Sequence, residues 1–309
     1  MKNKLTVTVG IIAHNEQENI SNLLISIAKQ KQVGFNLEKI LVICDGSTDE
    51  TAKRANKMSK KFTYIKVFND GKHLGKIKRL MELYKRNESD IVMSFDGDTV
   101  LARPDTLEKM VSKFTKPEIV YVGASGMPTK GRTLVETCIN TWDKLWDLAT
   151  KDVNGGNNIY NVHGFGTALR KDFAKRVKFP KGITADARML YFTARKEGKE
   201  FIYAKDAFVS YRSPSTLEEF LSRIHRSSKQ GVKFSEVYGK WVENEYTSIP
   251  MANKVGAIVQ MLSTSPIRTI LSGIFMLIAY KYPYTQAYIT NNGFWRPISS
   301  TKKSIPLTF

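Results

Sequence analysis

The sequence lacks a disulfide framework and any apolar run long enough to cross a bilayer. Two cysteines, Cys44 and Cys138, occur among 309 residues, too few for a cross-linked scaffold and typical of a reducing compartment. The apolar run 269–280 has about 12 residues, whereas a spanning helix needs roughly 20. The first residues show no signal-peptide core. We therefore expect a cytoplasmic chain with no membrane-spanning helix.

Several chemical signatures are also missing. Four histidines and two separated cysteines give no zinc-ligand spacing, and no G-x-x-x-x-G-K-[ST] phosphate loop occurs. The segment Gly164-Phe165-Gly166 fails the dinucleotide fingerprint because Leu169 stands at its sixth position. The sequence thus argues against zinc fingers, P-loop enzymes and nicotinamide-dependent oxidoreductases.

Positive charge is abundant. The formal net charge is +19 and the pI about 9.7, which favours anionic partners such as nucleic acid, acidic lipid or phosphate-bearing substrates. No nucleic-acid-binding motif is present, and many basic residues fall on expected helix faces, where they are usually solvated. We therefore expect no nucleic-acid partner. A basic nucleic-acid-binding protein is the alternative to the enzyme that the motifs below indicate.

Strands alternate with helices in the first third of the chain. Apolar runs predict strands over 5–12, 39–44, 63–68 and 90–95, and helical periodicity predicts helices over 16–31, 50–60, 76–86 and 105–114. This order is typical of an α/β fold with a mostly parallel sheet. Further along, we expect helices over 133–150 and 216–230, with a loop over 152–164. Trp142 and Trp146 favour a core position over a sugar-stacking platform.

Polar clusters follow three of these strands. The segment Ala13-His14-Asn15-Glu16 closes the first strand, Asp45 follows the second, and Asp96-Gly97-Asp98 ends the fourth. Ligands of open α/β sheets bind beyond the carboxyl ends of the strands. Two aspartates around a glycine can share a divalent cation that also bridges substrate phosphates, although an acidic helix-capping turn is the plain alternative.

Residues 1 to about 230 resemble the family 2 glycosyltransferases. The matching motifs, in the family's order, are VGIIAHNE, VICDGSTD, LGK, FDGD, GFGTALR, TAD and RIHRSSKQG. The resemblance implies a GT-A fold, a Rossmann-like mostly parallel sheet flanked by helices, and an inverting hexosyltransferase. UDP-sugars are favoured as donors, with GDP-sugars open.

The resemblance also implies roles for single residues. Ala13, Asn15 and Glu16 would hold the nucleoside, Asp45 would accept a hydrogen bond from the base, and Lys76 would lie near the diphosphate. Asp96 and Asp98 would form the D-x-D motif that binds Mn²⁺ or Mg²⁺, and Asp186 would be the general base. On local sequence alone, Asp186 could equally be a helix N-terminal acid. His163, Arg223 and Arg226 would lie on the diphosphate or acceptor side.

The sequence departs from the family's processive members. Arg226 is followed by Ser227 instead of tryptophan, no glutamine precedes it by three residues, and Ala185 replaces a second acid. We therefore expect transfer of one sugar. A nucleotidyltransferase on the same fold is a second alternative, but AHNEQEN is not a triphosphate-binding loop.

The C-terminal region has an interfacial character. We expect a catalytic domain over 1–231 and a helical region over 232–309, whose apolar segments are broken by Pro266 and Pro283 and flanked by basic and aromatic residues. This pattern suits peripheral attachment of residues 253–309 to an anionic membrane, at the inner face. The acceptor would then be lipid-linked or membrane-proximal. A helical hairpin packed on the catalytic domain is the alternative.

Overall fold

The structure is a computed structural model that describes residues 4–180, 182–281 and 298–309, with backbone only over 225–232. Its strands are β1 (Leu5–Ala13), β2 (Phe35–Cys44), β3 (Ile65–Asn69), β4 (Ile91–Asp96), β5 (Thr99–Leu101), β6 (Ile119–Pro128), β7 (Gly166–Arg170) and β8 (Glu200–Tyr211). Its helices are α1 (Ile20–Ala28), α2 (Thr51–Lys61), α3 (Lys76–Arg86), α4 (Thr106–Val111), α5 (Leu134–Thr150), α6 (Lys171–Arg176), α7 (Asp186–Lys196), α8 (Leu217–Tyr238), α9 (Trp241–Thr247), α10 (Met251–Thr264) and α11 (Pro266–Lys281). Short 3₁₀ turns lie at Val153–Gly156, Ile159–Asn161 and Ser300–Lys302.

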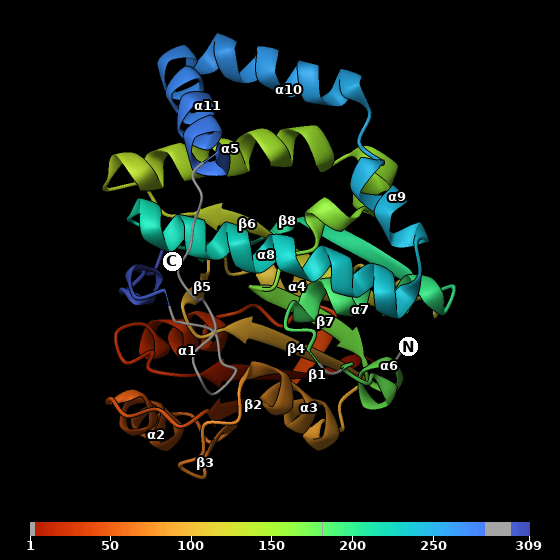
Figure 1. Cartoon of the computed structure of the whole chain (residues 1–309). Coiled ribbons are helices and arrows are strands. Elements are labelled where there is room, and N and C mark those ends of the chain that lie inside the picture. The colour runs from red at the N-terminus through yellow and green to blue at the C-terminus, as the bar shows by residue number, and fades with distance from the viewer. Residues whose placement is uncertain (1–3, 181, 282–297) are drawn as a thin grey trace. The chain divides into compact units, whose positions relative to one another are not determined.

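The strands form one sheet in the order β3-β2-β1-β4-β7-β6-β8-β5. The four strands expected from the sequence are its parallel half, β3-β2-β1-β4, and they lie side by side in Figure 1. β7 runs antiparallel to β4 and to β6, and β5 runs antiparallel to β8. The α/β class, the flanking helices and the helical C-terminal region are confirmed. The antiparallel half was not predicted.

Apolar residues of the parallel strands form the main core. Val9, Ile11, Val42 and Met93 are fully buried, as expected for strands covered on both faces. Gly10 lets α3 approach β1, since a Cβ there would lie 2.2 Å from Leu83 Cδ2. The sheet is thereby covered closely beside the ends of its parallel strands.

The chain divides into two compact units, each discontinuous in sequence. The first, here called the donor unit, comprises Met1–Met127, Val162–Tyr211 and Lys302–Phe309, and the second, the helical unit, comprises Pro128–Asn161 and Arg212–Thr301. This division differs from the expected one into 1–231 and 232–309. The donor unit contains the sheet, and its last eight residues come from the end of the chain.

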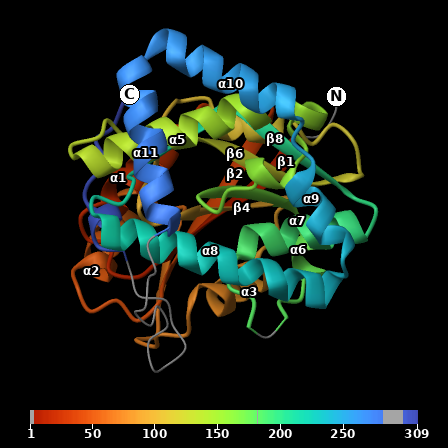
Figure 2. The same cartoon turned by 45° about the horizontal axis from the view of Figure 1, so that its top comes forward.

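The helical unit is built around α5, which begins with a capping box between Thr133 and Glu136. α10 and α11 pack against α5 (Figures 1 and 2). The expected loop over 152–164 contains two of the 3₁₀ turns, and the helix expected over 216–230 continues to Tyr238. Tyr282, Tyr284, Tyr288, Trp295 and Arg296 of the expected interfacial region lie outside the described residues.

Candidate active site

The three predicted polar clusters meet at one edge of the sheet. Ala13, the last residue of β1, pairs with Cys44 of β2, directly before Asp45. On the other side of β1, Ile12 pairs with Asp96 of β4. Parallel strands in register bring their carboxyl ends together. This edge therefore gathers Asp45, Asp96 and the loop after Ala13.

The loop after β1 is held by the loop after β2. Asn15 adopts φ 54°, a left-handed conformation that asparagine tolerates better than most residues. Its side-chain Oδ1 accepts from Thr48 N at 2.8 Å, and Glu16 N donates to Thr51 Oγ1 at 2.7 Å. The side-chain oxygen of Asn15 is thus bonded within the protein, and the backbone N–H of Glu16 is held by the side chain of Thr51.

Asp45 is buried and fully engaged with the loop that precedes α3. Its Oδ1 accepts from Leu74 N at 2.7 Å and from Arg79 Nε at 3.0 Å, and its Oδ2 accepts from Gly75 N at 2.9 Å. His73 Nδ1 lies 2.9 Å from the same Oδ2. A carboxylate has about four acceptor positions, so these contacts use the capacity that we expected a nucleobase to take.

His14 and His73 form a stacked pair beside Asp45, with ring centroids 4.3 Å apart. Nδ1 of His14 lies 2.7 Å, and Nδ1 of His73 3.0 Å, from the backbone oxygen of Asp45. The ligand atoms of the three side chains lie within 4.8 Å of one another, close enough to surround a cation. Arg79, bonded to the same carboxylate, disfavours a second cation there. We interpret the contacts among His14, Asp45 and His73 as structural, because they hold the loop after β1 and the loop before α3 together at the end of β2.

Lys76 joins the expected metal site to the expected general base. Its Nζ lies 2.7 Å from Asp96 Oδ1 and 3.1 Å from Asp186 Oδ2. Burial disfavours the charged amine, but the two aspartates outweigh it and raise the pKa of Lys76 above its ordinary value. Lys76 begins α3 and Asp186 begins α7, so two helix starts place these groups against the end of β4.

Carboxyl groups are crowded at this edge. Burial, together with Asp98, raises the pKa of Glu16 to about 8, while Lys302 acts in the opposite direction. Burial and Asp98 also raise the pKa of Asp96. Among the described residues of the edge, four carboxyl groups face two ammonium groups, which are Glu16, Asp96, Asp98 and Asp186 against Lys76 and Lys302. Carboxyl groups thus outnumber ammonium groups among these six side chains, a composition that suits a hard divalent cation.

The turn at Gly97 requires a residue without a side chain. A Cβ at Gly97 would lie 2.6 Å from Cγ of Glu16, a separation that real contacts do not reach. The D-x-D turn and the β1 loop are therefore in close contact through this glycine, and Glu16 lies beside the expected metal ligands.

His163 precedes a glycine that borders the Lys76–Asp186 pair. A Cβ at Gly164 would lie 3.7 Å from Lys76 Nζ and 4.0 Å from Asp186 Oδ1. His163 stacks on Phe165 with centroids 4.9 Å apart. The structure thus brings the His163 loop to the same edge.

The two predicted arginines belong to the helical unit. Arg223 Nη2 lies 3.6 Å from Asp143 Oδ2. The side chain of Arg226 lies outside the described residues. The expected role of Arg223 and Arg226 on the diphosphate or acceptor side therefore stays a prediction.

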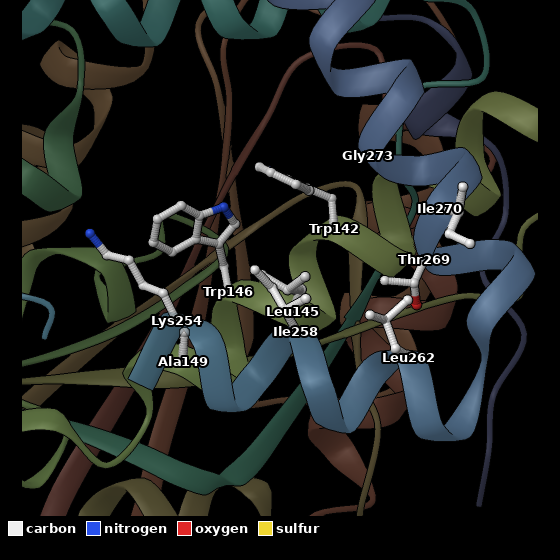
Figure 3. Close-up of a pocket in the computed structure, with 10 residues that line it drawn as sticks. All are labelled: Trp142, Leu145, Trp146, Ala149, Lys254, Ile258, Leu262, Thr269, Ile270 and Gly273. Atoms are coloured by element: carbon white, nitrogen blue, oxygen red, sulfur yellow. The ribbon is translucent and has the colours of Figure 1, made fainter. Parts of the chain in front are cut away.

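A largely apolar pocket of about 360 Å³ lies between α5, α10 and α11 (Figure 3). Its lining consists of Trp142, Leu145, Trp146, Ala149, Lys254, Ile258, Leu262, Thr269, Ile270 and Gly273. Trp146 stacks on Tyr160 with centroids 5.1 Å apart. Trp142 and Trp146 are half-buried and line this pocket. Their position is thus intermediate between the core position that we favoured and an exposed sugar-stacking platform.

The two C-terminal helices carry apolar residues on their exposed faces. On α10 and α11 these residues recur at helical spacing, and we call them the apolar stripe: Met251, Val255, Ile258, Val259 and Leu262, then Ile267, Ile270, Leu271, Ile274, Leu277 and Ile278. The buried side of α11 includes Thr269 and Ser272, and Ser272 Oγ donates to Cys138 O at 2.7 Å. In the described part of the chain, neither these helices nor any other is long and apolar enough to cross a bilayer.

Comparison with known proteins identifies the family. A family model described as glycosyl transferase family 2 matches residues 8–177, which are more than half of the chain and run from within β1 to beyond β7. The chain belongs to glycosyltransferase family 2. It is therefore an enzyme of the glycosyltransferase class, as the sequence motifs predicted.

Solved structures support the GT-A fold. A mannosyltransferase from Pyrobaculum calidifontis in complex with GDP-Man and Mn²⁺ superposes with a TM-score of 0.58 at 15% identity, covering 91% of this chain and 82% of that one. TarS residues 1–349 from Staphylococcus aureus gives a TM-score of 0.53 at 16% identity, covering 90% and 81%. Each comparison covers at least nine tenths of this chain.

A curated relative shares a shorter segment. The 4,4'-diaponeurosporenoate glycosyltransferase of Staphylococcus aureus is 30% identical over 112 residues, which are 36% of this chain and 29% of the relative. The chain thus matches less than a third of that protein's length.

Proposed function

We propose that this chain transfers one sugar, with inversion, from a nucleotide-sugar to a hydroxyl or phosphate of a lipid-linked or membrane-proximal acceptor. The observation that carries the proposal is the position of Lys76 between Asp96 and Asp186 at the carboxyl edge of the sheet. In this arrangement the ammonium group of Lys76 can neutralise the leaving diphosphate, Asp96 belongs to the D-x-D motif, and Asp186 is the candidate base.

The nucleoside would be held by the loop after β1. Ala13 and Asn15 would border it, and Glu16 would bond the ribose. Asp45 would order the loop that precedes Lys76, and a base N–H would bond its carboxylate by replacing His73, whose side chain is 38% exposed. UDP remains the favoured nucleotide, and GDP remains the alternative, because the fold relatives include complexes with both UDP and GDP-Man.

Asp98 and Asp96 would hold Mn²⁺ or Mg²⁺ together with the donor diphosphate. The residues fit such an ion: the edge is rich in carboxyl groups, and burial, together with the nearby charge of Asp98, raises the pKa of Glu16 and Asp96. Hard divalent ions bound through one or two carboxylates commonly complete their shell with phosphates and water. When bound, the ion would neutralise charge on the departing nucleoside diphosphate.

Asp186 would act as the general base. A donor diphosphate competes for the ammonium group of Lys76, which leaves Asp186 Oδ2 available for the acceptor proton. The acceptor oxygen then bonds to the anomeric carbon as the carbon–oxygen bond to the diphosphate breaks, and the proton passes to Asp186. A single displacement of this kind inverts the anomeric configuration. His163, Arg223 and Arg226 would contribute on the diphosphate or acceptor side.

The acceptor side is proposed from the helical unit. A pocket walled by indole and aliphatic side chains suits a hydrocarbon chain better than a glycan, and the apolar stripe suits the acyl region of a bilayer. The curated relative that shares 112 residues is named for a diaponeurosporenoate substrate. We therefore infer that the enzyme lies on the cytoplasmic face of an anionic membrane and that α10 and α11 are the interfacial part of residues 232–309.

A donor screen tests the proposal. The full-length chain is incubated with UDP- and GDP-sugars and with Mn²⁺, Mg²⁺ or EDTA, and nucleotide release is measured with and without a membrane lipid extract. We expect metal-dependent release from one sugar nucleotide, increased by the extract. Release from no donor under any condition would contradict the proposal, and binding of RNA at physiological salt would favour the nucleic-acid alternative.

A further inference from the structure

The last eight residues of the chain are part of the donor unit. Ile305 is 1% exposed, its N–H donates to Asn19 Oδ1 at 3.0 Å, and its carbonyl oxygen accepts from Asn22 Nδ2 at 2.9 Å. Thr308 Oγ1 donates to Ala102 O at 2.7 Å. These contacts join residues 206 to 286 positions apart in the sequence, so the C-terminal segment 302–309 is an integral part of this unit.

The same contacts reach the D-x-D turn. Asn19 is buried, and its Nδ2 donates to Gly97 O at 3.0 Å and to Thr99 O at 2.7 Å. One amide side chain therefore bonds the C-terminal segment on one side and the turn between Asp96 and Asp98 on the other.

Lys302 extends from this segment to the loop after β1. Its ammonium group donates to the backbone oxygen of His14 and to Oε1 of Glu16. Glu16 is 6% exposed, and its other oxygen, Oε2, has no hydrogen-bond partner among the described residues. A buried carboxyl oxygen left unbonded is costly. The arrangement leaves one polar position open at the place where we propose that the nucleoside binds.

We propose that Lys302 is a positioning residue of the donor site, which holds Glu16 so that its free Oε2 bonds a hydroxyl of the donor ribose. The inference rests on the proposed function. It assigns the C-terminal segment to recognition of a ribonucleoside diphosphate. Lys302 would contribute to recognition of the ribose hydroxyls through Glu16. Sites built to bond a hydroxyl reject the analogue that lacks it.

A role confined to folding would give a different result. If Lys302 only anchored the C-terminal segment, its loss would weaken all nucleotides alike. If it positions Glu16, its loss removes the preference for the hydroxyl that Glu16 contacts. Affinity for a nucleotide and for its deoxy analogues therefore separates the two roles.

The experiment is isothermal titration of the full-length protein with UDP and GDP and with the 2′-deoxy and 3′-deoxy form of each. The variants are Lys302→Met, Lys302→Arg and, as a matched control, Lys303→Met, each checked by thermal unfolding. We expect the wild type to prefer the ribonucleotide over at least one deoxy form by about tenfold or more. Lys302→Met should abolish that preference, Lys302→Arg should restore most of it, and Lys303→Met should resemble the wild type.

Two results overturn the inference while leaving the proposed function intact. They are an unchanged ribose preference in Lys302→Met, and an equal loss of affinity for every nucleotide tested. A wild-type protein that binds neither UDP nor GDP would instead refute the proposed donor class, and the inference with it.

Discussion

Asp98 illustrates how a residue can matter for activity without supporting the fold. It is half-buried in the turn after β4, and it adds to burial in raising the pKa of both Glu16 and Asp96. Removing it relieves that repulsion. We therefore expect Asp98→Ala to keep the fold and lose most donor turnover, and EDTA to do the same to the wild type. Asp206→Ala, on β8, is the control. Full turnover in Asp98→Ala or in EDTA would falsify the metal assignment.

Asp186→Asn tests the general base. The substitution keeps the size of the side chain and its contact with Lys76, but an amide cannot take the acceptor proton. We expect transfer to fall by roughly 10²–10⁴-fold, the usual contribution of such a base, with donor affinity nearly unchanged. Single-turnover transfer and donor titration measure the two quantities separately. A collapse of donor affinity with normal transfer per bound donor would show that the residue serves the donor instead.

The raised pKa of Cys44 predicts how slowly its thiol reacts at pH 8. It is 1% exposed, and burial raises the pKa of its thiol to about 11, although Arg79 acts in the opposite direction. Because the thiolate is the reactive form, the native Cys138→Ala variant should resist iodoacetamide at pH 8 and react at once in denaturant. Mass spectrometry measures the modified fraction. Rapid labelling of the native variant at pH 8 would contradict the burial of this thiol.

At the scale of elements, the contact between β1 and α3 depends on Gly10. A methyl group there would overlap Leu83, and overpacking of this kind costs about 1–3 kcal/mol. We expect Gly10→Ala to lower the free energy of unfolding by that amount. Gly256 on α10 has nothing within 4 Å of a Cβ, so Gly256→Ala should be neutral or stabilising by less than about 1 kcal/mol. Denaturant unfolding compares the two, and equal effects would refute the packing argument.

The parallel half of the sheet was predictable because its strands are continuous apolar runs followed by polar turns. The helix over 76–86 was predicted at its observed bounds. β6 was not, since its sequence, IVYVGASGMP, mixes apolar residues with Gly, Ser and Pro. Its place depends on antiparallel pairing with β7, and pairing between distant strands leaves no periodic signal in a single sequence.

The site was predictable where the side chain follows a strand, or where it lies in a family motif, as Lys76 and Asp186 do. Strand ends predicted that the loop after Ala13, Asp45 and Asp96 meet at one edge. The ring of His73 and the ammonium group of Lys302 reach the same edge from a loop and from the C-terminal segment. Each of these side chains contacts a residue 28 or more positions away in the sequence. The residues next to His73 and Lys302 in the sequence therefore did not predict that they lie at this edge.

At the scale of the whole molecule, the net charge of +19 and the apolar stripe act together. Apolar side chains bury in the acyl boundary, while basic residues favour anionic headgroups by about 1 kcal/mol each. We expect the full chain to co-sediment with anionic liposomes at low salt and less so at high salt. Ile267→Asp with Ile274→Asp should abolish this binding.

A matched control places the same charges elsewhere. Val33→Asp with Met81→Asp changes exposed apolar residues of the donor unit and should leave liposome binding intact. Substitution is preferable to truncation near residue 250, because truncation also removes the C-terminal segment from the donor unit. Equal loss in both double variants, or no binding by the wild type, would exclude the stripe as the attachment surface and favour an acceptor outside the membrane.

The C-terminal segment also has a consequence for biosynthesis. Domains generally fold from the N-terminus as the ribosome extends the chain, yet the donor unit needs residues 302–309 to cover Asn19 and to supply Lys302. Residues 302–309 leave the ribosome after every other part of the donor unit. The sheet can therefore form during translation before Lys302 contacts Glu16 and Ile305 contacts Asn19.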